Sequence, residues 1–198
     1  MIYTSRQVHA RVTAREISRV IASGRLIRAG RYYVTPDTAE GVRAALAAGL
    51  RPTCVTAAEE HGLWVPPVAG WHVYARRGSP GAGWVGHGWH PSWPESGSIA
   101  SPGLLLRHAI RCLDPLEVGI LADSALHEGL LDQDAVAALT ATAPRAVHRV
   151  LERTTGTAES GTESKVRLFL QLRNVSVTPQ VQIPGVGRVD NLAGRRWI

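Results

Sequence analysis

Seven arginines lie within the first 31 of the 198 residues, and guanidinium groups at this density can neutralise phosphates. They are Arg6, Arg11, Arg15, Arg19, Arg25, Arg28 and Arg31. Glu16 is the single acid of this segment, so its net charge is seven minus one, or +6. The whole chain also carries +6, so the remaining residues sum to zero. This segregation of charge predicts a polyanionic partner for the N-terminal segment.

The histidine pair in His87-Gly-Trp-His90 raises the question of zinc, because imidazole nitrogens are zinc ligands. Zinc needs further ligands, and no cysteine or second histidine pair stands at a suitable spacing in the sequence. Cys54 and Cys112 have no CxxC partner, so we expect two buried thiols without a disulfide. The sequence therefore predicts no cofactor for this chain, apart from the conditional magnesium discussed below.

Two capping boxes place the N-terminal arginines on short helices. Both 4–7 (TSRQ) and 13–16 (TARE) match the pattern S/T-x-x-E/Q, which predicts two helices joined by a tight turn near residues 11 and 12. In the second helix Arg15 and Arg19 are four residues apart and share one face. Ile17 and Ile21 belong to the opposite, apolar face.

A basic hairpin is predicted after these helices. Residues 25–28 and 31–34 are β-prone stretches on either side of Gly30, and Pro36 ends the second. Helix, turn, helix and hairpin is the order of a winged helix-turn-helix, whose second helix enters the major groove of DNA. The alternative is a small helical cap whose arginines are simply solvated.

The sequence patterns predict an α+β fold with four segments. Residues 1–36 are the predicted winged helix-turn-helix. Residues 37–153 form a mainly helical domain with a small antiparallel sheet in the Trp/Gly/Pro-rich segment 64–93, whose tryptophans we expect to form a core rather than to stack on bases. Residues 154–162 are a polar linker, and 163–198 an αββ unit.

Several side-chain placements are expected in the C-terminal half. Asp123, His127 and Glu128 are expected at the surface. Val166, Phe169 and Leu170 are expected to face inward from the helix that begins near Glu163, and Leu170 is followed by the predicted strands.

The N-terminal half resembles the AbiEi-type antitoxin family. The stretches that carry this resemblance are TAREISRVIASGRLIRAGRYYV, TCVTAAEEHGL and SIASPGLLLRHAIRCLD. The resemblance implies a winged-helix domain joined to a larger helical domain, which acts as the DNA-binding, autoregulatory half of an abortive-infection toxin–antitoxin pair.

The tail resembles the start of a Vsr-like endonuclease domain of the PD-(D/E)xK group. ESGTESKVRLFL and TPQVQIPGVGRVDNLAGRRWI carry the resemblance, through E-S-x-x-R and G-V-G-R-V-D. It implies that Glu163 is the helical acid and Asp190 the first strand acid and metal ligand of a Mg²⁺ site. A second strand acid is expected just after Ile198, so this site is incomplete in the sequence, and the tail is expected to pair with another chain or to be loosely ordered. Otherwise Glu163 is an ordinary first-turn acid and Asp190 a surface carboxylate.

Three function classes remain open. The leading hypothesis is a double-stranded-DNA-binding protein, a transcriptional repressor or antitoxin-like regulator. The first alternative is a Mg²⁺-dependent DNA endonuclease of restriction or repair type, of which this chain is a truncated form without activity. The second is a module that binds a cognate toxin or a second copy of the chain. No apolar run of membrane-spanning length and no signal-peptide pattern is present, so we expect a cytoplasmic protein with no membrane partner.

Overall fold

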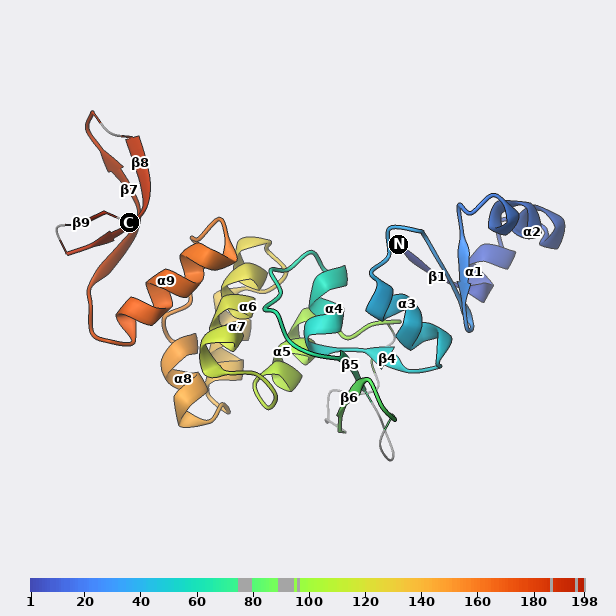
Figure 1. Ribbon diagram of the computed structural model, residues 1–198, viewed down its shortest axis with the longest axis horizontal. Coiled ribbons are helices and arrows are strands. Elements are labelled where there is room, and N and C mark those ends of the chain that lie inside the picture. The colour runs from blue at the N-terminus through green and yellow to red at the C-terminus, as the bar shows by residue number, and fades with distance from the viewer. Residues whose placement is uncertain (75–79, 89–94, 96, 186, 195, 198) are drawn as a thin grey trace. The chain divides into compact units, whose positions relative to one another are not determined.

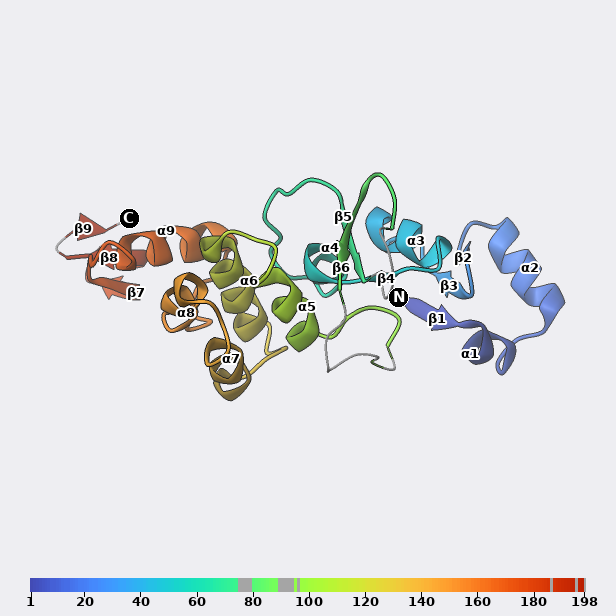
Figure 2. The ribbon, with the colours of Figure 1, turned by 90° about the horizontal axis from the view of Figure 1, so that it is seen from below.

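A computed structural model describes residues 1–74, 80–88, 95, 97–185, 187–194 and 196–197 (Figures 1 and 2). The chain divides into two compact units. Unit 1 comprises Met1–Glu60 and Val68–Ser101, and unit 2 comprises His61–Pro67 and Pro102–Ile198. Helices and small sheets occur in both units, which confirms the predicted α+β class. No helix in the described ranges has the length and apolar character needed to cross a bilayer.

The first part of unit 1 is a three-stranded antiparallel sheet with two short helices inserted after its first strand. In chain order these elements are β1 (Ile2–Thr4), α1 (Ser5–His9), α2 (Ala14–Ala22), β2 (Ile27–Ala29) and β3 (Tyr32–Val34). The strand order is β1-β3-β2, so β3 is central. Both predicted capping boxes are present, with Thr4 and Thr13 as N-caps. The predicted helix, turn, helix and hairpin order is therefore confirmed.

Strand β3 carries the core of this region on both of its faces, because successive side chains of a strand point to opposite sides. Tyr33 packs with Val8 of α1 and Ile17 of α2. Tyr32 and Val34 pack in a second cluster that includes Val42 and Leu46 of α3 (Glu40–Ala47). Helices α1 and α2 are thus anchored on one face of the sheet and α3 on the other.

A second sheet completes unit 1. It consists of β4 (Arg51–Pro52), β5 (Trp71–Tyr74) and β6 (Trp84–His87), in the order β4-β5-β6, and α4 (Cys54–Glu60) follows β4. Strands β4 and β5 are antiparallel, but β5 and β6 are parallel, so the expectation of an antiparallel sheet was wrong for this pair. The connection between β5 and β6 is longer than the two-residue turn of a tight hairpin, so its length does not require the two strands to be antiparallel.

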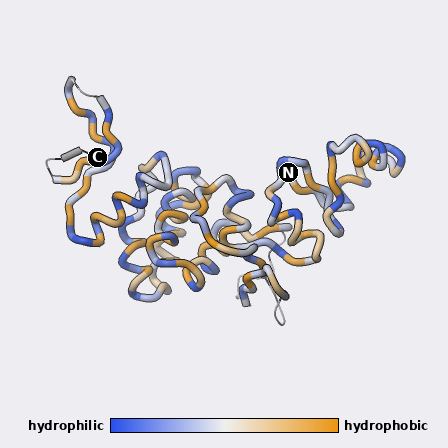
Figure 3. The backbone as a smooth tube through the Cα atoms, in the orientation of Figure 1, coloured by the Kyte–Doolittle hydropathy of each residue, from blue (hydrophilic) through white to orange (hydrophobic). Residues whose placement is uncertain are grey.

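Unit 2 consists of five helices followed by three short strands, within the described ranges. The helices are α5 (Pro102–Ala109), α6 (Pro115–His127), α7 (Gln133–Thr140), α8 (Arg145–Leu151) and α9 (Gly161–Gln171). Strands β7 (Val177–Ile183), β8 (Gly187–Ala193) and β9 (Arg196–Trp197) form an antiparallel sheet in that order. Hydrophobic and hydrophilic positions alternate along the backbone (Figure 3), as amphipathic helices require.

Helix α9 is part of the core of unit 2 rather than of a separate C-terminal segment. Its Leu168 packs against Ile120 of α6 and Val150 of α8. The predicted linker 154–162 is also held in place, since Thr154 and Ala158 are buried. The structure therefore divides the chain differently from the four predicted segments, because long-range packing joins α9 to the helices before it.

Candidate functional site

Helix α2 presents two arginines on its exposed face. Arg15 and Arg19 are both exposed, whereas Ile17 is buried in the cluster with Val8 and Tyr33. Thr13 is the N-cap of the helix. Its hydroxyl oxygen accepts a hydrogen bond from the Glu16 amide, and the Thr13 amide donates to the Glu16 carboxylate at 2.8 Å. The capping box thus fixes where α2 starts, and the apolar face fixes which side is exposed.

All seven N-terminal arginines are exposed, as the predicted phosphate-binding role requires. Within the described ranges, no carboxylate lies at ion-pair distance from any of them. Glu16 is the single acid of the segment, and its carboxylate is occupied by the Thr13 amide and hydroxyl. The backbone hydrogen bond from Thr13, followed by the bond from its hydroxyl, lowers the pKa of Glu16 below its ordinary 4.5. The single carboxylate of the segment is therefore ionised at neutral pH and is bound by its own helix cap rather than by one of the arginines.

The β2–β3 hairpin carries two further exposed arginines, Arg28 and Arg31, and its turn packs against α3. Gly30 has a φ of +59°, and a Cβ atom there would lie 2.6 Å from the Leu46 carbonyl oxygen of α3. The turn is therefore in close contact with α3. Arg31 stacks over the Tyr32 ring at 5.1 Å, and the Arg28 Nε donates to the Gly30 carbonyl at 3.4 Å.

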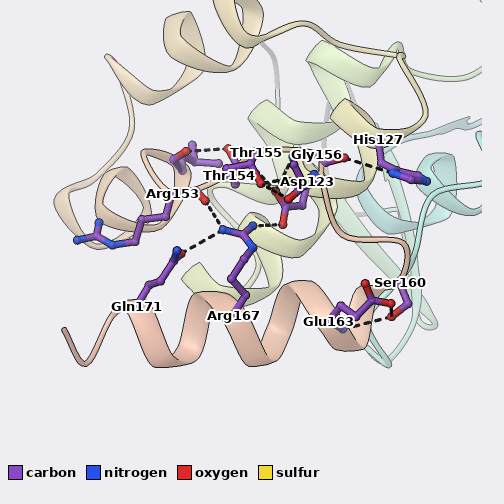
Figure 4. Close-up of polar contacts among 12 residues, drawn as sticks. Asp123, His127, Arg153, Thr154, Thr155, Gly156, Ser160, Glu163, Arg167 and Gln171 are labelled. Atoms are coloured by element: carbon purple, nitrogen blue, oxygen red, sulfur yellow. Dashed lines mark hydrogen bonds and ion pairs between the residues drawn. The ribbon is translucent and has the colours of Figure 1, made fainter. Parts of the chain in front are cut away.

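In unit 2, Glu163 is a capping residue of α9. Its amide donates a hydrogen bond to the Ser160 hydroxyl oxygen (Figure 4). The Ser160 hydroxyl donates in turn to Glu163 Oε1 at 2.8 Å. The other carboxylate oxygen accepts from the Glu159 amide at 3.0 Å and from the Gln180 side-chain amide at 3.1 Å. Both oxygens are thus engaged with protein donors, which fits the alternative of a first-turn acid better than that of a ready metal ligand.

Asp190 is exposed on β8. In the β7–β8 register Pro179 pairs with Asn191 and Val181 with Val189, so Gln180 and Asp190 occupy the position between these pairs. Gln180 has a φ of +53°, a left-handed conformation that is rare inside a strand. Through Gln180 the structure connects Glu163 to the position opposite Asp190, but it shows no direct bond between the two acids.

A buried ion pair in unit 2 was missed by the sequence reasoning. Asp123 and Arg167 are each 1% exposed, and Arg167 Nη2 donates to Asp123 Oδ2 (Figure 4). Asp123 Oδ1 also accepts the amides of Thr155 and Gly156 at 2.8 and 3.1 Å. The prediction of Asp123 as a surface charge was therefore wrong. His127, by contrast, is exposed as predicted.

The buried face of α9 also differs from the prediction. Val166 and Phe169 were expected to face inward but are 37% and 42% exposed, while Arg167 and Leu168 are buried. The physical reason is that Arg167 finds a carboxylate, the Arg153 carbonyl and the Gln171 side chain inside unit 2. These bonds offset the cost of burying the charge, so α9 can bury Arg167 while Val166 and Phe169 are exposed.

No protein-family model, no curated protein and no solved structure matches this chain.

Proposed function

We propose that unit 1 binds double-stranded DNA through α2 and the surface around it, and that the protein acts as a transcriptional repressor or antitoxin-like regulator. The observation that carries the proposal is the set of seven exposed arginines without a carboxylate partner in the described ranges. Guanidinium groups bind phosphate oxygens with paired hydrogen bonds, and exposed cations release counterions from DNA when they bind.

The geometry of α2 supports a role as the groove-entering helix of a winged helix-turn-helix. Nine residues at 1.5 Å each give a helix about 14 Å long, and a B-DNA major groove is about 12 Å wide, enough to admit one helix. Arg15 and Arg19 are about 6 Å apart along the axis on one side. Since the hairpin turn lies against α3, we assign the main contribution to α2 and a smaller one to Arg28 and Arg31.

Binding of labelled duplex DNA, measured by fluorescence anisotropy at several salt concentrations, tests the proposal. If about four phosphates are contacted, log K falls with log salt at a slope of about −3.6. Between about 50 and 200 mM salt the affinity of the wild type then drops roughly 150-fold. A slope near zero, or no binding at low salt, would refute DNA binding.

A matched pair of double variants locates the binding surface. Arg15→Ala with Arg19→Ala should reduce the slope to about −1.8, because two phosphate contacts are lost. Arg145 and Arg149 are also four residues apart and exposed, on α8 of unit 2. Replacing these two by alanine removes the same charge, and we expect binding close to that of the wild type. Equal losses from both double variants would mean that only net charge matters.

An endonuclease is the second candidate, because Gln180 lies opposite Asp190 in the strand pair and bonds to Glu163, which places both acids in one region of unit 2 although Glu163 acts there as a helix cap. In this hypothesis Asp190 is a ligand of Mg²⁺, which would activate a water molecule for attack on a phosphodiester. Nicking of supercoiled plasmid with Mg²⁺ or Mn²⁺ measures this activity. Activity that survives Asp190→Asn would exclude the assigned site.

A further inference from the structure

Three side chains with zinc-binding chemistry come together in unit 1. They are Cys54, His72 and His87, and their sulfur and ring nitrogen atoms lie within 4.8 Å of one another. Cys54 is 0%, His72 2% and His87 7% exposed. A thiol and two imidazoles in a buried cluster are the donor types that zinc prefers. His90, the partner of His87 in the sequence motif, lies outside the described residues.

The parallel strand pair puts both histidines on one face of the second sheet. His72 of β5 is opposite Val85 of β6, and His87 is two residues beyond Val85. Residues two apart in a strand share a face, so His72 and His87 point to the same side. The His72 Nδ1 and His87 Nε2 atoms are 3.1 Å apart.

The segment around Cys54 is bonded directly to the backbone of His72. The Thr53 amide donates to the His72 carbonyl at 3.0 Å, and the His72 amide donates to the Thr56 hydroxyl at 2.7 Å. Cys54 itself has a φ of +49°, in the left-handed region that non-glycine residues rarely adopt. Unusual backbone conformations of this kind are concentrated at functional sites, where the surrounding structure holds them.

The spacing of the two imidazole nitrogens is compatible with a tetrahedral metal. Two nitrogens bound to zinc at about 2.0–2.1 Å with a tetrahedral angle are about 3.3 Å apart, close to the observed 3.1 Å. Burial lowers the pKa of His72, and a bond to the Ala69 backbone opposes this only in part.

We propose that Cys54, His72 and His87 bind one Zn²⁺ ion that cross-links β5, β6 and the start of α4. The three protein ligands leave a fourth tetrahedral position for a water molecule or another side chain. Such a cross-link suits this sheet, because β5 and β6 have four residues each and β4 has two. Its role is to stabilise unit 1, which goes beyond the proposed DNA binding.

Metal analysis of the full chain, purified without a histidine tag, is the first test. We expect about one zinc ion per chain. Removing the zinc with a chelator should lower the melting temperature by roughly 5–11 °C. This is the shift expected when free zinc is present at about a hundred times its dissociation constant. Added zinc should restore the original melting temperature. Protein that contains no zinc and whose melting temperature does not change with added zinc would overturn the proposal.

Variants identify the ligands. Cys54→Ala, His72→Asn and His87→Asn should each weaken zinc binding by more than about 100-fold and abolish the effect of the chelator on melting. His9→Asn is the control, because His9 is an exposed histidine on α1 of the same unit. If either histidine variant binds zinc as tightly as the wild type, the assignment is wrong.

Cobalt substitution of the wild type keeps the test decisive even where the variants do not fold. Co²⁺ in this site should show the visible bands of tetrahedral coordination and a near-ultraviolet thiolate-to-metal band. Cys112 is the other cysteine of the chain, so Cys112→Ala is recorded in parallel to apportion the thiolate band. The competing explanation is a direct hydrogen bond between the two imidazoles without metal. It predicts neither band, and that result would overturn the zinc site.

Discussion

The buried Asp123–Arg167 pair leads to a strong prediction about stability. Both side chains are almost completely buried, so removing one of them leaves the other as an uncompensated charge in the core of unit 2. Breaking such a pair costs about 3–5 kcal/mol. In Asp123→Ala the amides of Thr155 and Gly156 also lose their acceptor, which places the loss at the upper end of that range.

Thermal and urea unfolding followed by circular dichroism measure this loss. For a chain of this size we expect the melting temperature of Asp123→Ala to fall by about 10–20 °C. Asp123→Asn keeps an oxygen for the two amides and should lose less. Asp134→Ala is the control: Asp134 is exposed on α7, and its loss should stay within about 0.5 kcal/mol of the wild type.

A double variant separates the ion pair from the space that it fills. Replacing Asp123 by Ala and Arg167 by Met together removes both charges, so we expect a loss well below the sum of the two single losses. Asp123→Ala within about 1 kcal/mol of the wild type would show that the pair is not buried in solution.

Two further predictions concern helices. Gly103 in α5 has open space where a Cβ would lie, whereas a Cβ at Gly119 in α6 would collide with Val150. Gly103→Ala should therefore be neutral or stabilise by up to about 1 kcal/mol, and Gly119→Ala should destabilise, as unfolding in urea would reveal. Thr13→Ala removes the cap of α2 and should cost about 1 kcal/mol. Because the Glu16 pKa is lowered on folding, its stabilising effect should be lost as the pH falls below about 4.5, and Glu16→Gln should lack this acid step.

The N-terminal region was predictable because its signals are local. Each capping box joins residues three apart, and Gly30 adopts the positive φ that the hairpin turn requires. Partners this close in sequence can be recognised without knowledge of the fold. The same holds for the helices of unit 2, whose apolar positions recur with helical spacing.

The interior of unit 2 was less predictable, because its partners are far apart in sequence. Asp123 and Arg167 are 44 residues apart in the sequence. Nothing in the sequence distinguishes either residue from a charged residue at the surface. Periodicity favoured Val166 and Phe169 as the inner face of α9, yet the carboxylate of Asp123 made it possible to bury Arg167 instead. Hydrophobic patterning alone does not anticipate a compensated charge.

The proposed zinc ligands illustrate an intermediate case. The sequence test for zinc considered ligands at close spacing around His87, and so it did not consider Cys54, which lies on another element. A usable signal was present, however. Both predicted strands contain a histidine, His72 and His87, and pairing them would have put two imidazoles side by side. What the sequence did not reveal was that the pairing is parallel and that Thr53 and Thr56 fasten the Cys54 segment to His72.

The distribution of acids strengthens the case for an external phosphate partner. The carboxylate of Glu16 accepts hydrogen bonds from Thr13, and that of Glu163 accepts from Ser160 and Gln180. The carboxylate of Asp123 forms an ion pair with Arg167. Each of these acids has donors supplied by its own unit. The seven N-terminal guanidiniums have no such counterpart in the described ranges. Their mutual repulsion opposes folding of the segment. An anionic partner would relieve it, and the duplex phosphate backbone offers regularly spaced negative charges for this purpose.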